Sequence, residues 1–284
     1  MVIYQNLMVA IIIVTLIMML KTKKESVMEK ELMPILINPY TGNSVKKLDG
    51  ALADCKTGER FPIREGIPVL LREEGVVGRN KVWQKKYDRF SYFYDLLFVL
   101  FSKVKKLYKD STRIMDIDNE HRVLETSIGT GKQIENLLEQ GKKANFYGMD
   151  ISYGMLRGCW RNALKLGLGL KLVQANAEAV PFRDKTFDVV FHFGGINFFN
   201  DKKKAIEEMV RVARPGAKIY IADESIKLVE DQPAIFSLFS RNIDPGLFTP
   251  PLDLIPRSML NIEKRELWDG KFYFISFKKP GGNH

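Results

Sequence analysis

The chain has 284 residues, of which 45% are hydrophobic, and it carries 44 Lys and Arg against 34 Asp and Glu, a net charge of +10. This length and apolar content allow one large domain with appendages and exclude a chain too polar to form a core. The positive charge suits nucleic acid or an anionic membrane surface, and because no aromatic and basic RNA-binding signature is present, we expect a membrane and no nucleic acid. Cys55 and Cys159 are too few for a disulfide framework or a metal site, so no metal is expected.

The N-terminus predicts a membrane anchor. Residues 2–20 are almost all apolar, and Lys21, Lys23 and Lys24 follow them. About twenty apolar residues of helix span the core of a bilayer. A cleaved signal peptide would carry positive charge before its apolar run, and this chain has none there. We therefore expect a transmembrane signal anchor with its basic flank over residues 1–24, a single pass, and a catalytic domain on the cytoplasmic side.

Residues 32–72 are expected to form a small β-rich module. The segment 60–71 resembles the last strand of the Trm112-like zinc-ribbon modules (Y-P-I-x-x-G-I-P-x-L), and residues 38–42 stand where that family has its first C-P-x-C-G knuckle. Four other residues occupy the positions of the zinc ligands: Asn38, Thr41, Asp54 and Thr57. Because a structural zinc needs four cysteine or histidine ligands, we expect a degenerate, metal-free ribbon that serves for packing or for contact with a protein partner.

Residues 80–284 alternate apolar strands with helices, which is the pattern of a doubly wound α/β sheet. Seven strands are expected, over residues 122–126, 145–149, 170–174, 189–193, 218–222, 262–268 and 271–278, and helices over 132–140, 153–166 and 202–212. Asp269 and Gly270 predict a hairpin turn between the last two strands. We expect a seven-stranded, mostly parallel sheet with a C-terminal antiparallel hairpin, and a ligand over the carboxyl ends of its central strands.

A glycine-rich turn follows the first of these strands and opens a helix. Glu125 ends the strand, and Gly129 and Gly131 lie in the turn. Glycine lets the backbone approach a ligand closely, and the first turn of the helix offers unpaired N–H groups. Asp150 ends the next strand, where a carboxylate can accept both hydroxyls of a ribose. Such a turn alone is a weak signal, so the segments that follow have to define the cofactor.

Five segments in order resemble the class I S-adenosylmethionine-dependent methyltransferases of the small-molecule and quinone-biosynthesis type. Residues 125–131 resemble the first motif of that family, 150–156 its D-x-S-x-x-M-L segment and 174–182 its G-D-A-E-x-L-P-F segment, while 187–190 and 211–217 resemble F-D-x-V and R-V-L-K-P-G-G. The resemblance covers about residues 80–284. It implies a Rossmann-like methyltransferase fold, S-adenosyl-L-methionine as the cofactor, and methyl transfer as the activity.

The resemblance also implies a set of cofactor contacts. Glu125, Ser127, Gly129 and Gly131 would face the methionine portion of the cofactor. Asp150 would bind the ribose. The remaining expected contacts, including those to the adenine, are Ile151, Met155, Asn176, Ala177 and His192.

Two positions depart from the family pattern. Ser127 replaces the first glycine of the loop and leaves slightly less room beside the cofactor. Asn176 stands where an aspartate usually accepts the adenine amino group, and its carbonyl oxygen offers an acceptor in the same place. Some proteins keep this fold and lose the reaction, so both departures leave an inactive protein open as an alternative.

The acceptor side is less readable. His192 and Asn197 lie where the active site opens and are the catalytic candidates, because a base there could take a proton from a hydroxyl, thiol or activated carbon. The alternative for His192 is a ring that only packs on the cofactor or the strand ends. Asp223 and Glu224 are further candidates for polar contacts. Several aromatic residues suggest an apolar acceptor pocket, or plain core: Phe198, Phe199, Phe236, Phe239 and Phe248.

Two segments could cover the site. Residues 87–95 resemble the element that covers the cofactor pocket in small-molecule methyltransferases. Together with the apolar run 96–101 and the lysines after it, they either pack on the core or form a membrane-facing entrance. The Pro-rich residues 244–256 predict an irregular loop that could close over the site.

The favoured function is a membrane-anchored methyltransferase acting on a small lipophilic acceptor (a quinone precursor, lipid or thiol). The alternative is an inactive methyltransferase-fold protein that serves as a membrane-bound partner or scaffold.

Overall fold

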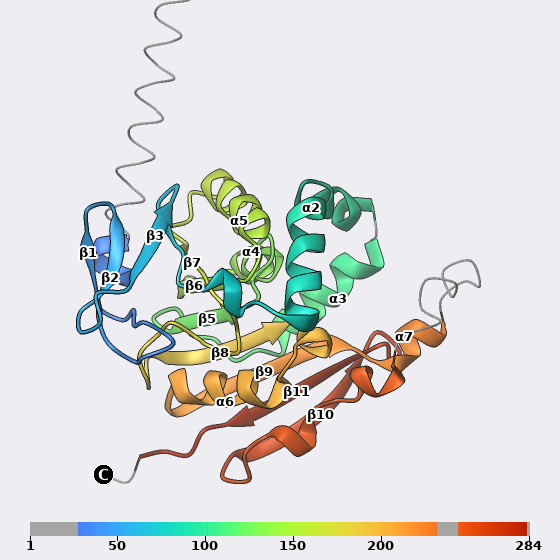
Figure 1. Ribbon diagram of the computed structural model, residues 1–284. Helices are drawn as coiled ribbons and strands as arrows, with labels where there is room; N and C mark the ends of the chain where they lie inside the picture. Colours follow the sequence, from blue (N-terminus) through green and yellow to red (C-terminus); the bar gives the residue numbers. More distant parts are fainter. Residues whose placement is uncertain (1–27, 101, 232–243, 283–284) are drawn as a thin grey trace, which may run out of the picture.

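A seven-stranded sheet forms the centre of the molecule (Figure 1). The computed structural model describes residues 28–100, 102–231 and 244–282. The strands of the sheet are β5 (Arg122–Thr126), β6 (Asn145–Asp150), β7 (Lys171–Gln174), β8 (Phe187–Phe193), β9 (Ala213–Glu224), β10 (Leu260–Leu267) and β11 (Phe272–Lys278). Their order is β10-β11-β9-β8-β5-β6-β7. The strands β5 to β9 run parallel, and β11 is antiparallel to both β9 and β10.

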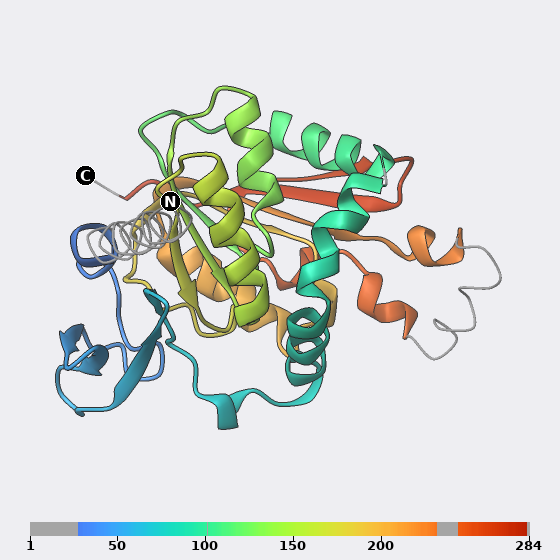
Figure 2. The same ribbon diagram turned by 90° about the horizontal axis from the view of Figure 1, so that it is seen from above.

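Helices cover both faces of this sheet (Figures 1 and 2). On one side lie α2 (Gly78–Leu100), α3 (Ser102–Arg113), α4 (Lys132–Glu139) and α5 (Tyr153–Lys165), and on the other lies α6 (Lys202–Val212). The short helices are η1 (Met28–Leu32), η2 (Glu73–Gly75), η3 (Ile196–Phe198), α7 (Ile226–Glu230), η4 (Pro245–Phe248) and η5 (Leu252–Leu254). The predicted doubly wound sheet with its terminal hairpin is confirmed.

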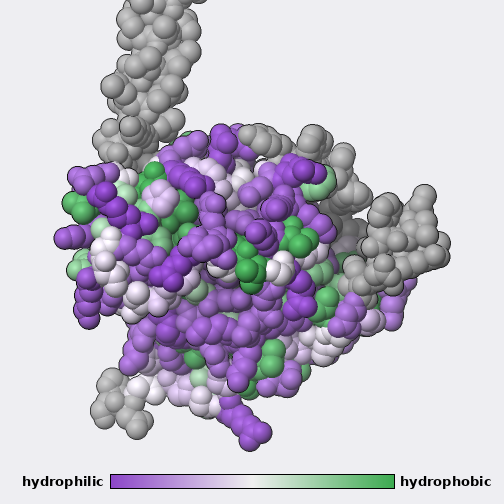
Figure 3. All heavy atoms as spheres, viewed as in Figure 1, coloured by the Kyte–Doolittle hydropathy of each residue, from purple (hydrophilic) through white to green (hydrophobic). Residues whose placement is uncertain are grey.

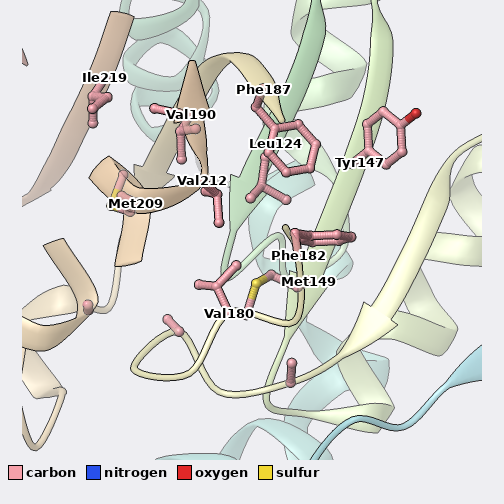
Figure 4. Packing of buried hydrophobic residues seen from close by; sticks show 14 of the residues in the cluster. Leu124, Tyr147, Met149, Val180, Phe182, Phe187, Val190, Met209, Val212 and Ile219 are labelled. Atoms are coloured by element: carbon pink, nitrogen blue, oxygen red, sulfur yellow. The ribbon is translucent and has the colours of Figure 1, made fainter. Parts of the chain in front are cut away.

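The apolar core has two layers because successive side chains of a strand point to opposite faces. Val123 packs with residues of α3, α4 and α5, whereas its neighbour Leu124 packs with residues of α6. In Figure 4, Tyr147, Phe182 and Phe187 lie close together in the α6 layer. Their rings meet edge to face at centroid distances of 5.1–6.4 Å, an arrangement that aromatic pairs favour.

A second, small sheet is formed by β1 (Val45–Leu48), β2 (Ala51–Asp54), β3 (Arg60–Arg64) and β4 (Ile67–Pro68), all antiparallel in that order. The loop before β1 and the loop after β2 are tied together by the carboxylate of Asp54. This carboxylate accepts hydrogen bonds from the side chains of Asn38 (2.8 Å) and Thr41 (2.6 Å) and from the backbone N–H of Thr57 (2.9 Å). Burial opposes ionisation, but these bonds outweigh it and hold the pKa of Asp54 well below its usual range. Hydrogen bonds therefore join the two loops for which the sequence predicted a degenerate, metal-free ribbon.

The small sheet is joined to the edge of the large one. The N–H of Leu70 donates to the carbonyl of Gln174 on β7 (2.9 Å), and Leu36 forms an antiparallel bridge with Phe182. Leu36 and Leu70 belong to the same buried cluster as Leu124. The two sheets therefore share one core, although the boundaries predicted at 32–72 and 80–284 stay predictions.

The predicted membrane anchor requires a correction. Residues 1–24 lie outside the described residues, and within the part that the structure describes no helix combines the length and apolar character that crossing a bilayer needs. The long helix α2 has 23 residues, but Lys81, Lys85 and Lys86 are on it. Within the described residues, the fold class is corrected to the seven-stranded α/β sheet with the small β-sheet, and no helix there could span a membrane. The single-pass membrane location with a cytoplasmic catalytic domain is withdrawn with it.

The surface seen in Figure 3 is mainly hydrophilic, with scattered hydrophobic residues. The large apolar side chains exposed among the described residues include Val77, Val82 and Phe90, near the start of α2 and along it. Hydrophobic residues scattered singly over a surface are ordinary for a folded protein and do not define an interface.

Candidate active site

One cavity opens at the carboxyl ends of the parallel strands, where ligands bind in open α/β sheets. One half of it is formed by the loops after β5, β6 and β7, and we call this the cofactor half. The other half, which we call the acceptor half, is formed by α2, α3, the ends of β8 and β9, and β11. The cofactor half is lined by Glu125, Ser127, Ile128, Gly129, Thr130, Lys132, Gln133, Met149, Asp150, Ile151, Met155, Ala175, Asn176 and Ala177.

The loop after β5 bends back through three residues in the left-handed region. Ser127 has φ +67°, Gly129 has φ +57° and Gly131 has φ +84°. Gly131 does not line the cavity. It is the N-cap of α4, and a Cβ there would lie 2.9 Å from Sγ of Cys159. A left-handed serine costs about 1–2 kcal/mol relative to glycine, so the backbone conformation, and not only the size of the side chain, distinguishes Ser127 from the usual glycine.

Glu125 ends β5 as a buried acid, with 2% of its surface exposed. Its Oε2 is buried and has no hydrogen-bond partner among the described residues. Burial, and then the negative charge of Asp150, raise the pKa of Glu125 well above its usual range. A buried carboxyl of this kind fits a ligand group that donates hydrogen bonds and carries positive charge.

Asp150 joins the loops that follow β5 and β6. Its Oδ2 accepts from the N–H of Gly129 (2.9 Å), and its Oδ1 accepts from the N–H of Ser152 (2.8 Å). Burial raises the pKa of Asp150 to about 6, although these two bonds oppose the shift. The carboxylate therefore fixes the glycine-rich loop as well as lining the cavity.

Asn176 lies in the loop after β7. Its side-chain Oδ1 accepts from the N–H of Glu178 (3.0 Å), which closes a turn of the Asx type. The carboxylate of Glu178 accepts from Nδ2 of Asn80 on α2 (2.8 Å) and from the N–H of Asp201 (3.1 Å). These bonds connect the cofactor half to the helix that covers the acceptor half.

The acceptor half is mainly aromatic. It is lined by Asn80, Trp83, Tyr87, Tyr108, Phe193, Gly194, Gly195, Phe198, Phe199, Asp223, Glu224 and Phe272. The rings of Trp83 and Phe198 lie 4.2 Å apart between centroids, and those of Tyr108 and Phe193 lie 4.6 Å apart. Phe248 is not in the lining and packs behind Phe198 at 5.9 Å, while the predicted Phe236 and Phe239 lie outside the described residues.

Two acids end β9 in this half. The carboxylate of Asp223 accepts from the N–H groups of Gly195 (3.1 Å), Asn197 (2.8 Å) and Glu224 (2.8 Å), and burial raises its pKa. Burial, and then the charge of Asp223, raise the pKa of Glu224 to about 7.

His192 and Asn197, the predicted catalytic residues, are not part of the lining. His192 is 1% exposed, and its Nδ1 lies 3.2 Å from Oγ1 of Thr126. Burial lowers the pKa of His192 to about 4. Asn197 is fully buried, and its side chain accepts from the hydroxyl of Tyr273 (3.0 Å) and donates to the carbonyl of Glu224 (2.8 Å). Both side chains lie behind the cavity wall, so the packing alternative for His192 agrees better with this geometry.

Sequence reasoning missed several lining residues. Trp83 and Asn80 come from the first turns of α2, and Tyr108 and Phe272 come from α3 and β11. No local motif marks them, since each reaches the cavity only through the packing of distant elements. One signal was available in the sequence: Asn80 and Trp83 shortly precede the element from residue 87 that was predicted to cover the cofactor pocket.

The parallel sheet, the cavity at its strand ends and the two acids at Glu125 and Asp150 define the class of α/β proteins that bind a nucleotide-like cofactor. Residues 124–221 match the family model described as a methyltransferase domain. A ubiquinone/menaquinone biosynthesis C-methyltransferase of Pasteurella multocida is 34% identical over 132 residues, which cover 45% of this chain and 48% of that protein. A demethylmenaquinone methyltransferase of Shouchella clausii is 30% identical over 169 residues, covering 57% of this chain and 72% of that protein.

The chain belongs to the family of S-adenosyl-L-methionine-dependent methyltransferases that includes these relatives. It spans about half the length of the Pasteurella protein. A solved complex of phosphoethanolamine N-methyltransferase 2 from Haemonchus contortus with S-adenosyl-L-methionine has a TM-score of 0.57 at 15% identity and covers 78% of this chain and 62% of its own. That likeness shows the fold alone.

Proposed function

We propose that this protein transfers a methyl group from S-adenosyl-L-methionine to a small lipophilic aromatic acceptor, with a quinol as the first candidate. One observation carries the proposal: a single cavity joins a half lined by acids and backbone N–H groups to a half walled by aromatic rings. The names of the relatives, which refer to quinone biosynthesis, support the choice of acceptor.

The described residues fit the cofactor. Glu125, with its unpartnered buried Oε2, would hold the methionine ammonium group, and Asp150 would hold the ribose hydroxyls. Asn176 and Ala177 would border the adenine. The other residues that would contact the cofactor are Ser127, Gly129, Ile151 and Met155, whereas the predicted Gly131 and His192 lie outside the lining. When bound, the cofactor supplies an electrophilic methyl group on a positively charged sulfur.

The aromatic wall would hold a planar acceptor. Trp83 and Phe198 present ring faces and edges against which another ring can pack, and such contacts are worth about 0.5–1.5 kcal/mol each beyond the area they bury. Excluding water and holding the acceptor in line with the methyl group are the protein's main contributions to a displacement reaction. The small sheet, which resembles Trm112-like ribbons in sequence, would support β7 and so the adenine end of the cavity.

The second candidate function is a methyltransferase-fold protein that has lost the reaction. Two observations favour it: the left-handed Ser127 in the loop and the commitment of Oδ1 of Asn176 to the N–H of Glu178. Calorimetric titration of the full chain with S-adenosyl-L-methionine separates the candidates at their first step, since no binding would favour the inactive protein.

Methyl transfer itself decides between them. The full chain is incubated with methyl-labelled S-adenosyl-L-methionine and a short-chain demethylmenaquinol, and in parallel with a membrane lipid extract. We expect label in the quinol and in one lipid of the extract, identified by mass. Label that appears in neither would contradict the proposed function.

A further inference from the structure

Glu224 occupies a particular position in the acceptor half. It is the last residue of β9, pairs with Phe272 of β11, and lines the cavity with Phe193 and Phe198. Among the described residues, no hydrogen bond or ion pair to its carboxylate is present, whereas the carboxylate of its neighbour Asp223 accepts three backbone N–H groups. Its side chain therefore faces aromatic surroundings.

The backbone of Glu224 is held on both sides by buried polar groups. Its N–H donates to the carboxylate of Asp223 (2.8 Å), and its carbonyl accepts from Nδ2 of Asn197 (2.8 Å). Asn197 is in turn fixed by the hydroxyl of Tyr273 (3.0 Å) and by its own N–H, which donates to Asp223 (2.8 Å). Such a network holds the backbone from which the carboxylate extends more firmly than a free loop would.

The other titratable candidates near the cavity are less suited to reach an acceptor. Glu125 and Asp150 belong to the cofactor half, and the carboxylate of Asp223 already accepts three backbone N–H groups. His192 is buried behind the wall with 1% of its surface exposed. Glu224 is the carboxylate of the described acceptor half that combines access to the cavity with a fixed backbone.

We propose that Glu224 is the general base that takes the proton of the acceptor, and this inference rests on the proposed function. For a quinol, Glu224 accepts the hydroxyl proton while the neighbouring ring carbon forms its bond to the methyl group and the carbon–sulfur bond breaks with its electron pair to sulfur. The methylated carbon then loses its hydrogen as a proton to water, the ring electrons return to the oxygen, and Glu224 gives the hydroxyl its proton back. One proton is released for each methyl group transferred, and Asn197, Asp223 and Tyr273 act as positioning residues.

The surroundings of Glu224 adapt it to this role near neutral pH. Burial and the charge of Asp223 raise its pKa to about 7, close to the pH at which a base works best. Tyr273 of β11, whose pKa is raised by burial and by these two acids, and Lys202 of α6, which is attracted to Asp223, lie near this corner. Tyr87 of α2 and Tyr108 of α3 line the same half of the cavity. Because only the ionised carboxylate accepts a proton, turnover rises with pH through the pKa of Glu224 and is flat above it.

The test compares Glu224→Gln with the unaltered full chain and with Glu139→Gln, an exposed glutamate at the end of α4. The cofactor affinity, the KM for the short-chain demethylmenaquinol, and kcat from pH 5.5 to 9 are measured. Removal of a general base costs about 10²–10⁴-fold in rate. We expect Glu224→Gln to bind cofactor within about twofold of normal and to lose at least about 100-fold in kcat. The rise in kcat with pH through the pKa of Glu224, about 7, should disappear as well.

Each outcome separates the inference from the function on which it rests. If the unaltered chain methylates the quinol and Glu224→Gln keeps kcat within about threefold, the base is another group and the proposed function stands. If the unaltered chain binds cofactor and methylates no acceptor, both fall. Should Glu224→Gln not fold, Glu224→Asp keeps the charge at a shorter reach. It is then expected to retain the pH limb at a kcat about tenfold lower, and a normal kcat would overturn the assignment.

Discussion

The two halves of the cavity differ in how the chain builds them. The cofactor half is made by short loops that follow consecutive parallel strands, so that Glu125, Gly129 and Asp150 meet at one edge of the sheet. The acceptor half is made by residues such as Trp83, Tyr108 and Glu224, which are far apart in the chain. The first half therefore depends on local backbone conformation and the second on the packing of whole elements.

This difference predicts separable effects of mutation. A substitution in the cofactor half should change the affinity for the cofactor more than the KM for the acceptor. A substitution in the aromatic wall should change the KM for the acceptor more than the affinity for the cofactor. Glu178, which connects the two halves through Asn80 and Asp201, should affect both.

The largest effect is expected for Asp150→Ala. It removes the acceptor of the ribose hydroxyls and also releases the N–H groups of Gly129 and Ser152. Charge-assisted hydrogen bonds contribute about 1.5–3 kcal/mol each, so we expect cofactor affinity to fall at least about 100-fold, measured by calorimetry. Asp118→Ala, at an exposed position, is the control, and an unaltered affinity would place the ribose elsewhere.

The ionisation of Asp150 gives a pH test of the same site. Its pKa is raised to about 6 by burial, so the carboxylate is ionised above that pH and protonated below it. Cofactor affinity is expected to be constant from pH 7 to 8 and to fall as the pH is lowered through about 6. An affinity that does not change down to pH 5 would contradict the role of the ionised carboxylate.

A smaller effect, confined to the KM for the acceptor, is expected for Trp83→Ala. Its indole packs on Phe198 at 4.2 Å and lines the cavity. Loss of an aromatic contact and its buried area should raise the KM for a quinol about tenfold or more, with cofactor affinity changed less than about twofold. Phe90→Ala is the control, because Phe90 is on the same helix and is 56% exposed. An equal loss of cofactor affinity would mean that the halves are not separable.

Glu178→Gln tests the connection between the halves. The glutamine keeps its size but weakens the acceptor for Asn80 and for the N–H of Asp201. We expect cofactor affinity and acceptor KM to worsen together, each about threefold to tenfold, whereas the exposed Glu207→Gln should leave both unchanged. A change in only one of the two constants would show that α2 is held independently of the loop after β7.

The smallest effect is expected for Ser127→Gly. A glycine accepts φ +67° without the cost that a serine has there. The substitution should stabilise the protein by about 1 kcal/mol and raise Tm by about 2–4 °C in thermal unfolding. A lowered Tm would mean that the serine side chain stabilises the loop more than its backbone conformation costs.

The same contrast explains what the sequence could predict. The alternation of apolar strands and helices is enough to locate β5 and α6 at their observed bounds, because each element reports its own pattern. The motif loops predicted residues that do line the cofactor half, among them Glu125, Asp150 and Asn176, but the predicted Gly131 and His192 do not line it. The left-handed backbone conformation of Ser127 was not predicted, because a serine in a sequence does not indicate a positive φ. The position of Trp83 in the cavity was not predicted either, because it depends on how α2 crosses the strand ends.

His192 is the opposite case, a residue that was predicted to reach the site and does not line the cavity. Its position at the end of β8 predicted access to the site, but side chains alternate along a strand, and its ring is directed into the wall beside Thr126. The membrane anchor was predicted from the apolar run at residues 2–20 and the lysines after it, and these residues lie outside the part of the chain that the structure describes.

The division of the cavity into two halves is tested most directly by a crystal structure of the full chain with S-adenosylhomocysteine and a short-chain quinol. We expect the amino group of the ligand at Glu125, its ribose hydroxyls at Asp150, and its sulfur facing the quinol between Trp83 and Glu224. A ligand bound outside this cavity, or a quinol bound in the cofactor half, would contradict this division and the proposed function that depends on it.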